Sequence, residues 1–191
     1  MKRDSIRTHL RPYSIYGRRV TTINHAFASA IAPSDAYDDA LIVQALRTLG
    51  QDPDQELVCV YCDRNPAETW DHIFSLVTDK RYSGYGHAIG NLLPCCRSCN
   101  SSKGNRHWQT FLRAIITDDT LYNAKVEQLR VFFERYQQPP LDQSAIEQLC
   151  PAEMQQLQEV QRRILELMKE ADIIAGNIRR NVQEHLQQVT P

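Results

Sequence analysis

The chain has 191 residues, of which 42% are hydrophobic and 24% are charged, and its formal net charge is −1. These values are typical of a soluble globular protein with a core, and they argue against a polycation that coats nucleic acid indiscriminately. No apolar run approaches the ~20 residues that a membrane-spanning helix needs. The N-terminal residues also lack the apolar stretch of a secretory signal. We therefore expect a reducing cytoplasm, where clustered cysteines are more often metal ligands than disulfides.

The first region that we expect, residues 1–55, is helical with a basic arm. Residues 2–19 carry six basic side chains against one acid, and residues 35–56 carry six acids against one arginine. A basic arm of this kind either contacts nucleic acid or is an exposed, solvated terminus. We expect one helical segment to begin near residue 22 and to stop at Pro33. Ser34 and Asp35 are expected to cap a second helix, which ends at Gly50.

Residues 56–115 differ in composition and are expected to form a second region. Residues 56–61 and 67–74 are predicted strands with a turn between them, because the first run is rich in β-branched residues and a proline-containing stretch follows it. A polar loop over residues 75–90 comes next, and the pattern becomes helical after Cys96.

The third expected region, residues 116–191, is helical throughout. Helices are predicted over residues 121–136 and 144–149, and a long one runs from Pro151 to about residue 188. Apolar residues of the long helix recur at alternating spacings of three and four, as in a heptad seam. This seam either packs against helices of the same chain or forms a homodimer. Its residues are Leu157, Val160, Ile164, Leu167, Ala171, Ile174 and Ile178.

Four of the six cysteines form two C-x2-C pairs, Cys59 with Cys62 and Cys96 with Cys99. Two such pairs are typical of a closed, tetrahedral zinc site with a structural role. The 33 residues between the pairs exceed the gap of a simple zinc ribbon, so a functional insert is expected there. We expect Cys95 and Cys150 to be small buried apolar residues.

The insert and the segment after it contain a second set of motifs. Asp71-His72 lies on a predicted strand, Asn91-Leu92-Leu93-Pro94 precedes the second cysteine pair, and Asn100 follows that pair, three residues before Lys103. In this order the motifs resemble those of the HNH endonucleases, over residues 56–113. The resemblance implies an α+β, mostly helical fold with a zinc-stapled ββα-metal core flanked by helical regions. One departure is Ser75, where many members of the family have proline.

The resemblance also implies a function, the metal-dependent hydrolysis of DNA phosphodiester bonds. His72 would be the general base, since its pKa lies close to working pH. Asp71 and Asn100 would bind one Mg²⁺ or Mn²⁺, which acts as a Lewis acid. Asn91 would orient the base. Other interpretations of Asn100 and Asn91 stay open, because Asn100 also suits a helix cap and Asn91 also suits an ordinary turn. His87 is expected to be a solvated loop residue.

The expected partner is double-stranded DNA, held by basic residues near the site. The candidates for phosphate contacts are Lys80, Arg81, Arg97, Lys103 and Arg106. The alternative is a solvated helical face.

Three other functions share parts of this pattern. A zinc-knuckle module that binds nucleic acid without catalysis stays open, although Asp71, His72 and Asn100 argue against it. A zinc deaminase is excluded, because Ser98 stands where its P-C-x-x-C motif needs cysteine, and no glutamate follows His72. A helical protein that carries a decayed nuclease is disfavoured by the intact ligand set.

Overall fold

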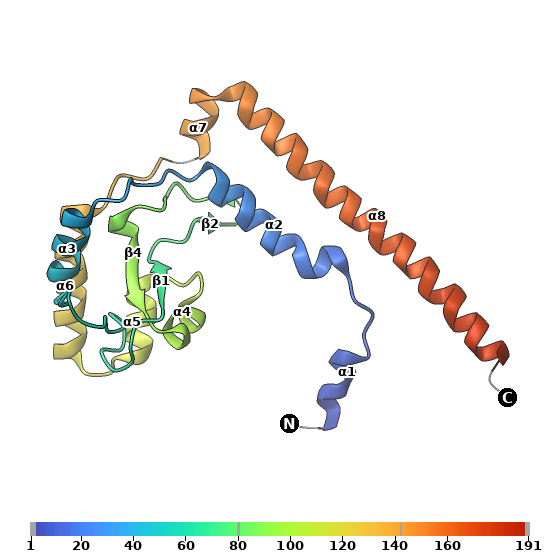
Figure 1. Cartoon of the computed structure of the whole chain (residues 1–191), viewed down its shortest axis with the longest axis horizontal. Helices are drawn as coiled ribbons and strands as arrows, with labels where there is room; N and C mark the ends of the chain where they lie inside the picture. The colour runs from blue at the N-terminus through green and yellow to red at the C-terminus, as the bar shows by residue number, and fades with distance from the viewer. Residues whose placement is uncertain (1–2, 80, 142, 190–191) are drawn as a thin grey trace. The chain divides into compact units, whose positions relative to one another are not determined.

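The computed structural model describes residues 3–79, 81–141 and 143–189 (Figure 1). These residues form eight α-helices, two short 3-10 helices and two two-stranded sheets. The chain divides into two compact units. The central unit comprises residues 28–145, and the end unit combines the residues up to Phe27 with those from Ile146 onward. The boundaries that we expected near residues 55 and 115 both fall inside the central unit.

The end unit is built on two helices, α2 (Ile15–Ile31) and α8 (Pro151–Val189). Asp172 of α8 accepts hydrogen bonds from the backbone N–H of Ile15 and Tyr16, at 2.6 and 3.1 Å, and so caps α2. Further along α2, Asn24 accepts a hydrogen bond from Gln161. Residue numbers rise along α2 while those of its partners on α8 fall, so the two helices are antiparallel. The Ser14 hydroxyl also accepts from the N–H of Gly17 at 2.8 Å, so a local cap and Asp172 together hold the start of α2, seven residues before the expected position.

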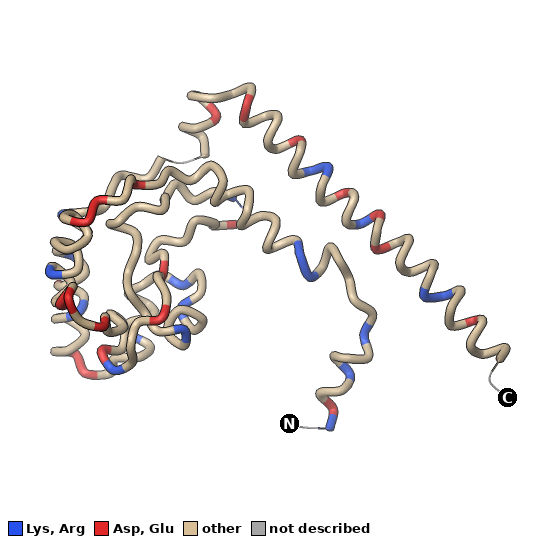
Figure 2. The backbone as a smooth tube through the Cα atoms, in the orientation of Figure 1, with Lys and Arg blue, Asp and Glu red and all other residues tan. Residues whose placement is uncertain are grey.

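The remaining short elements of the chain ends are η1 (Arg3–Ser5), α1 (Ile6–His9) and α7 (Gln143–Leu149). Figure 2 marks the Lys and Arg positions that recur along α1 and the first turns of α2. Cys150, which we expected to be buried, is exposed. It joins α7 to α8, and its neighbours on both sides are exposed as well, so no core reaches it.

The centre of the second unit is a hairpin of β1 (Thr69–His72) and β4 (Leu92–Cys95). The strands pair antiparallel, with Thr69 opposite Cys95 and His72 opposite Leu92. The second cysteine pair leads into α4 (Arg97–Lys103), which contacts β1 and completes a ββα arrangement. The loop between the strands contains β2 (Val77–Thr78), β3 (Arg81–Tyr82) and η2 (Ile89–Asn91).

Three more helices cover this hairpin, namely α3 (Asp39–Thr48), α5 (Trp108–Ile115) and α6 (Asp119–Tyr136). Their apolar faces meet the hairpin in one core that includes the fully buried residues Tyr61, Leu93, Phe111, Leu112, Leu129 and Phe132. Segments that precede and follow the hairpin in the sequence thus pack against it in one core. This packing is why residues 55 and 115 both lie within the central unit.

Two local expectations are corrected here. The expected strand at residues 56–61 is only an isolated bridge between Val58 and Pro66, because the chain turns there to present Cys59 and Cys62. Helix α3 begins later than expected, and its cap is Asp38, whose carboxylate accepts from the N–H of Leu41. Asp35 instead accepts a hydrogen bond from the N–H of Ile89 at 2.7 Å. Gly50, with φ of 70°, ends α3 as expected.

Within the described residues, no helix has both the length and the apolar character that crossing a membrane would require.

Candidate active site and zinc staple

The four paired cysteines converge as their spacing predicts. The Sγ atoms of Cys59, Cys62, Cys96 and Cys99 all lie within 4.8 Å of one another. A tetrahedral zinc with Zn–S bonds of about 2.3 Å places its sulfurs roughly 3.8 Å apart, so the cluster fits this ion. The first pair lies on a turn in which Asp63 has a φ of 50°. The second pair forms the start of α4, where Cys96 is the N-cap.

The pKa values of these thiols show that a bound cation would have to stabilise their thiolate forms. Burial is the main cause that raises the pKa of Cys59 and of Cys99 above the usual range. Burial acts in the same direction on Cys96, but the backbone N–H of Cys99 and the amide of Asn65 outweigh it and lower its pKa to about 7. Buried thiols that resist ionisation are stabilised as thiolates by a divalent cation at their centre. Burial also raises the pKa of Cys95 to about 12, which suits an inert core thiol.

Asp71 and His72 are neighbours on β1 and therefore point to opposite faces of the strand. The Asp71 side chain is buried against α4. Its Oδ2 accepts a hydrogen bond from the Tyr61 hydroxyl at 2.5 Å and forms an ion pair with Nζ of Lys103 at 2.9 Å. Burial, followed by the charge of Asp71, raises the pKa of Tyr61 well above its usual value, so this hydroxyl stays a donor.

Lys103 was expected among the phosphate-contacting residues, and the structure corrects this. Its side chain has no exposed surface, and its ammonium also donates to the carbonyl of His72 at 3.0 Å. A buried ammonium with three acceptors in the protein, the third being the carbonyl of Gly104 at 3.5 Å, is not part of a phosphate-binding surface. Its contacts instead join α4 to β1 at the Asp71-His72 pair.

The half-buried His72 ring lies beside His87, a residue that we expected to be solvated. Nε2 of His72 is 3.0 Å from Nδ1 of His87, and the ring planes meet at 71°. Burial and then the neighbouring His87 lower the pKa of His72 below its usual value. A neutral imidazole is the form that accepts a proton from water. The sequence contains only a weak indication of this contact, because no characteristic spacing relates a single histidine in a polar loop to His72.

Asn91 connects the loop to the end of β1. Its side-chain oxygen accepts from the N–H of Phe74 at 2.9 Å, and its amide donates to the carbonyls of Phe74 and Gly86 at 3.0 and 2.9 Å. The residue is 3% exposed. Because Phe74 follows His72 by two positions, these bonds hold the backbone just beyond it.

Asn100 lies on α4 three residues before Lys103, and therefore on the same face of the helix. In the described part of the chain, its side chain has no hydrogen bond and Oδ1 of Asp71 has no partner. A carboxylate and an amide oxygen are hard donors of the kind that Mg²⁺ and Mn²⁺ bind. The donor set thus fits the expected catalytic cation, with Oδ1 as the available atom of Asp71.

The other basic residues that we expected to contact phosphate differ in their surroundings. Arg81 is exposed on β3, and Arg97 is exposed and 3.7 Å from Glu68. Arg106 donates to the carbonyl of Ser102 and lies over the Phe111 ring at 5.2 Å. Lys80 lies outside the described residues.

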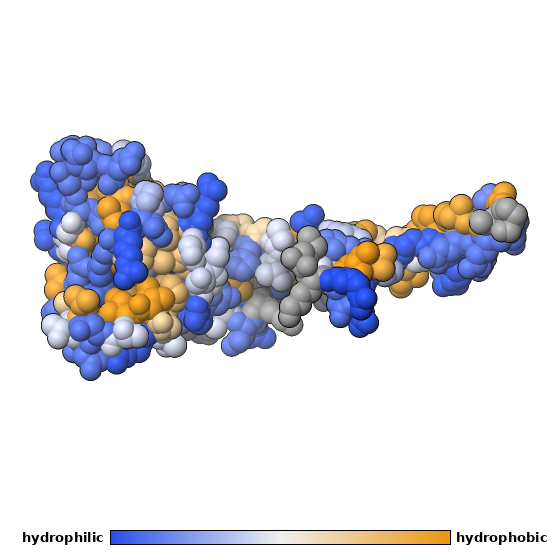
Figure 3. Space-filling view, turned by 90° about the horizontal axis from the view of Figure 1, so that it is seen from below, coloured by the Kyte–Doolittle hydropathy of each residue, from blue (hydrophilic) through white to orange (hydrophobic). Residues whose placement is uncertain are grey.

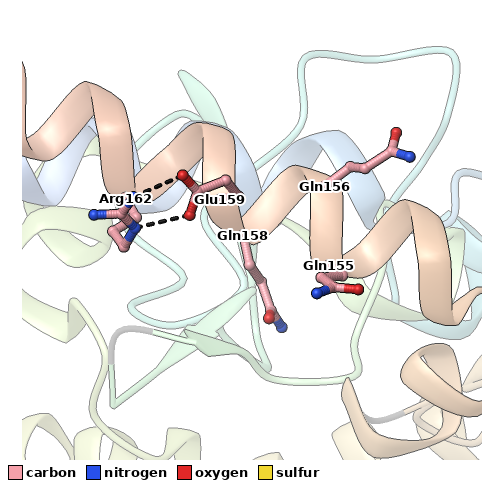
Figure 4. Close-up of a pocket in the computed structure, with 5 residues that line it drawn as sticks. All are labelled: Gln155, Gln156, Gln158, Glu159 and Arg162. Carbon is pink, nitrogen blue, oxygen red and sulfur yellow. Dashed lines mark hydrogen bonds and ion pairs between the residues drawn. The ribbon is translucent and has the colours of Figure 1, made fainter.

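A hollow elsewhere on the surface lacks reactive side chains. A hollow on α8 is lined by Gln155, Gln156, Gln158, Glu159 and Arg162 (Figure 4). Its charged members are paired with each other at 2.6 Å, and the rest are amides. This set offers neither a nucleophile nor a metal site.

Comparison with known proteins identifies the part of the chain that carries the site. Residues 59–106 match the family model described as HNH endonuclease, which is roughly a quarter of the chain and includes both cysteine pairs. Searches of curated proteins and of solved structures gave no significant match.

Proposed function

We propose that this chain, which contains an HNH endonuclease domain at residues 59–106, is a metal-dependent endonuclease that hydrolyses phosphodiester bonds of double-stranded DNA. The observation that supports this most is the pair Asp71-His72 on a strand that α4 holds through Lys103. It unites a partly exposed base on one face with hard oxygen donors on the other. The four-cysteine cluster connects α4 to the turn before β1 and would hold this geometry when zinc is bound.

In the proposed reaction, His72 takes a proton from a water molecule as that water attacks phosphorus. A new P–O bond forms, the bond to one ester oxygen breaks, and the departing oxygen takes a proton from solvent water and ends as a hydroxyl. Asp71 and Asn100 would hold one Mg²⁺ or Mn²⁺, which when bound stabilises the negative charge on the phosphate and the leaving oxygen. Asn91 keeps the backbone after His72 in place, and the exposed Arg81 and Arg97 would contact DNA phosphates.

The alternative is a zinc-knuckle module that binds nucleic acid without cutting it. The buried donors around Asp71 have no role in such a module beyond stability. The exposed arginines, in contrast, would serve both functions, so only catalysis separates the two.

The decisive experiment uses zinc-loaded full-length protein and supercoiled plasmid, with Mg²⁺ or Mn²⁺, and with EDTA as a control. We expect nicking or linearisation that EDTA abolishes and that His72→Ala lowers at least 100-fold, the lower range for a general base. The matched control is His185→Ala, which removes an exposed histidine from α8 and should leave cleavage unchanged. Tight binding of plasmid without any cleavage would favour the module.

We also propose that the protein forms a homodimer through α8. Of the expected seam, Val160, Leu167, Ile174 and Ile178 are 47–60% exposed, whereas Leu157, Ile164 and Ala171 are partly buried. Apolar side chains are visible near the C-terminal end of this helix (Figure 3). Light scattering should give twice the monomer mass, and Leu167→Glu with Ile174→Glu should halve it. A monomer at high concentration would exclude the dimer.

A reducing cytoplasm remains the proposed location, because the zinc cluster needs free thiols.

A further inference from the structure

The contact between His72 and His87 has a consequence for which atom of His72 can act as a base. Nε2 of His72 and Nδ1 of His87 are 3.0 Å apart, which is a hydrogen-bond distance with the proton on one of the two rings. In either case Nε2 of His72 is occupied by the contact. Only Nδ1 of His72 is left to take a proton from water.

The two possible proton positions differ in their chemistry. If His87 carries the proton on Nδ1, then neutral His72 carries its own on Nδ1 and has no free lone pair. If His72 carries the proton on Nε2, His87 accepts the bond and Nδ1 of His72 keeps its lone pair. Only the second arrangement makes His72 a general base.

The backbone of His87 is held by contacts outside the matched domain. Its N–H donates to the carbonyl of Pro33 at 2.8 Å, and its carbonyl accepts from the N–H of Asp35 at 3.2 Å. The Asp35 carboxylate in turn accepts from the N–H of Ile89 at 2.7 Å and from the amide of Gln138 at 2.8 Å. The loop around His87 is thus fixed by the segments before and after the domain.

Two glycines show how closely these segments approach the loop. A Cβ on Gly86 would lie 2.2 Å from the carbonyl oxygen of Pro33, and one on Gly90 would lie 2.1 Å from that of Tyr136. Backbone contacts this close leave no space for any other residue type. They restrict the loop on either side of His87, and so restrict where its ring can lie.

We propose that His87 is a positioning residue that holds His72 as the Nε2–H tautomer, and that the segments around Pro33 and Gln138 exist in part to hold His87. The inference rests on the proposed function, because it assigns the base atom of that reaction. When His72 takes the proton at Nδ1, its ring becomes an imidazolium. The bond from its Nε2–H to Nδ1 of His87 is then charge-assisted and stronger.

The first test reads the tautomer directly and needs no DNA. Two-bond ¹H–¹⁵N correlation spectra of zinc-loaded protein, at a pH where both rings are neutral, distinguish Nε2–H from Nδ1–H. His72→Ala identifies the signals of His72. We expect the Nε2–H pattern in the wild type, an averaged pattern in His87→Ala, and recovery of the Nε2–H pattern in His87→Asn. The Asn side chain places an acceptor oxygen near the position of Nδ1.

Three controls make this test specific. His185→Ala should leave the His72 signals unchanged. Tryptophan fluorescence and zinc content confirm that the variants are folded. The proposal is overturned by an Nδ1–H pattern in the wild type, or by an Nε2–H pattern that persists in His87→Ala. It is overturned as well if added Zn²⁺ or Mn²⁺ shifts both rings together, because the pair would then be a metal site.

Cleavage kinetics provide the second test. His87→Ala should lower kcat about 10- to 100-fold with little change in KM, and His87→Asn should restore most of kcat. Equal losses in both variants would contradict the role of the acceptor. If the wild type cuts no DNA, the proposed function fails, while the spectra still decide whether His87 sets the tautomer of His72.

Discussion

The buried ion pair between Asp71 and Lys103 is a structural element whose loss should be measurable. We expect Lys103→Met to lower the free energy of unfolding of the central unit by about 3–5 kcal/mol. Methionine approximates the apolar stem of lysine, so the change removes mainly the charge and its hydrogen bonds. It leaves the buried carboxylate of Asp71 without its cation and the carbonyl of His72 without its donor.

The magnitude follows from the geometry of the pair. The side chains are 0% and 6% exposed, and Nζ lies 2.9 Å from Oδ2. Two unit charges at that distance attract by roughly 6 kcal/mol at an effective dielectric constant of about 20. Desolvation of both ions offsets much of this attraction, so the intact pair contributes little net stability, but a single remaining charge is costly.

The combined variant Lys103→Met, Asp71→Leu, Tyr61→Phe tests this reasoning. It replaces both charges and the hydroxyl that donates to Asp71 by apolar groups, so no side chain of the trio is left unpaired, and the carbonyl of His72 loses its donor as it does in Lys103→Met alone. We expect it to lie within about 2 kcal/mol of the wild type, closer than Lys103→Met alone. A single variant that costs less than about 1 kcal/mol, or a combined variant that loses the sum of three large effects, would refute the argument.

Urea unfolding of zinc-saturated protein, followed by tryptophan fluorescence, is the appropriate assay. The chain has two tryptophans, Trp70 and Trp108, and both belong to the central unit. The signal therefore reports on this unit and is not mixed with unfolding of the helices at the chain ends.

Three further predictions concern the metal, the base and the DNA surface. Chelation of zinc, or Cys96→Ser, should unfold the central unit. The reason is that structural zinc contributes roughly 10–16 kcal/mol in small sites, which is comparable with the whole stability of a domain. Tryptophan emission that stays native after chelation would contradict this. Burial and His87 lower the pKa of His72, so the neutral base persists to lower pH, and the acid limb of kcat/KM should lie below pH 6.5; a limb above that value would show that another group controls the rate. Arg81→Ala should lower the magnitude of the slope of log affinity against log salt by about 0.9, the value for one lost phosphate contact. The control Arg130→Ala removes a residue that is already paired with Glu127 and Glu134, and it should not change the slope. Gel shifts at several salt concentrations compare the two variants.

Local spacing determined the parts of this protein that the sequence could predict. Two C-x2-C pairs place thiols on tight turns, and ligands this close in sequence have few ways to meet one ion. Asp71 and His72 are adjacent on a short strand, so their opposite orientation follows from the pleat. The last helix also follows from its spacing, and its expected end lay within a residue or two of the observed one.

Tertiary contacts decided the rest, because they join residues that no local pattern connects. The partner of His72 is 15 positions away, in a loop that Pro33 and Asp35 hold from outside the domain. Lys103 resembled a surface cation in sequence, yet inside the protein its ammonium is stabilised by the carboxylate of Asp71 and the carbonyl of His72. The first N–H of α2, that of Ile15, is bound by Asp172, 157 residues away, which no local pattern indicates. In each case the free energy comes from a contact that exists only once the chain has folded, so the sequence supplies the chemical groups and the fold determines which of them meet.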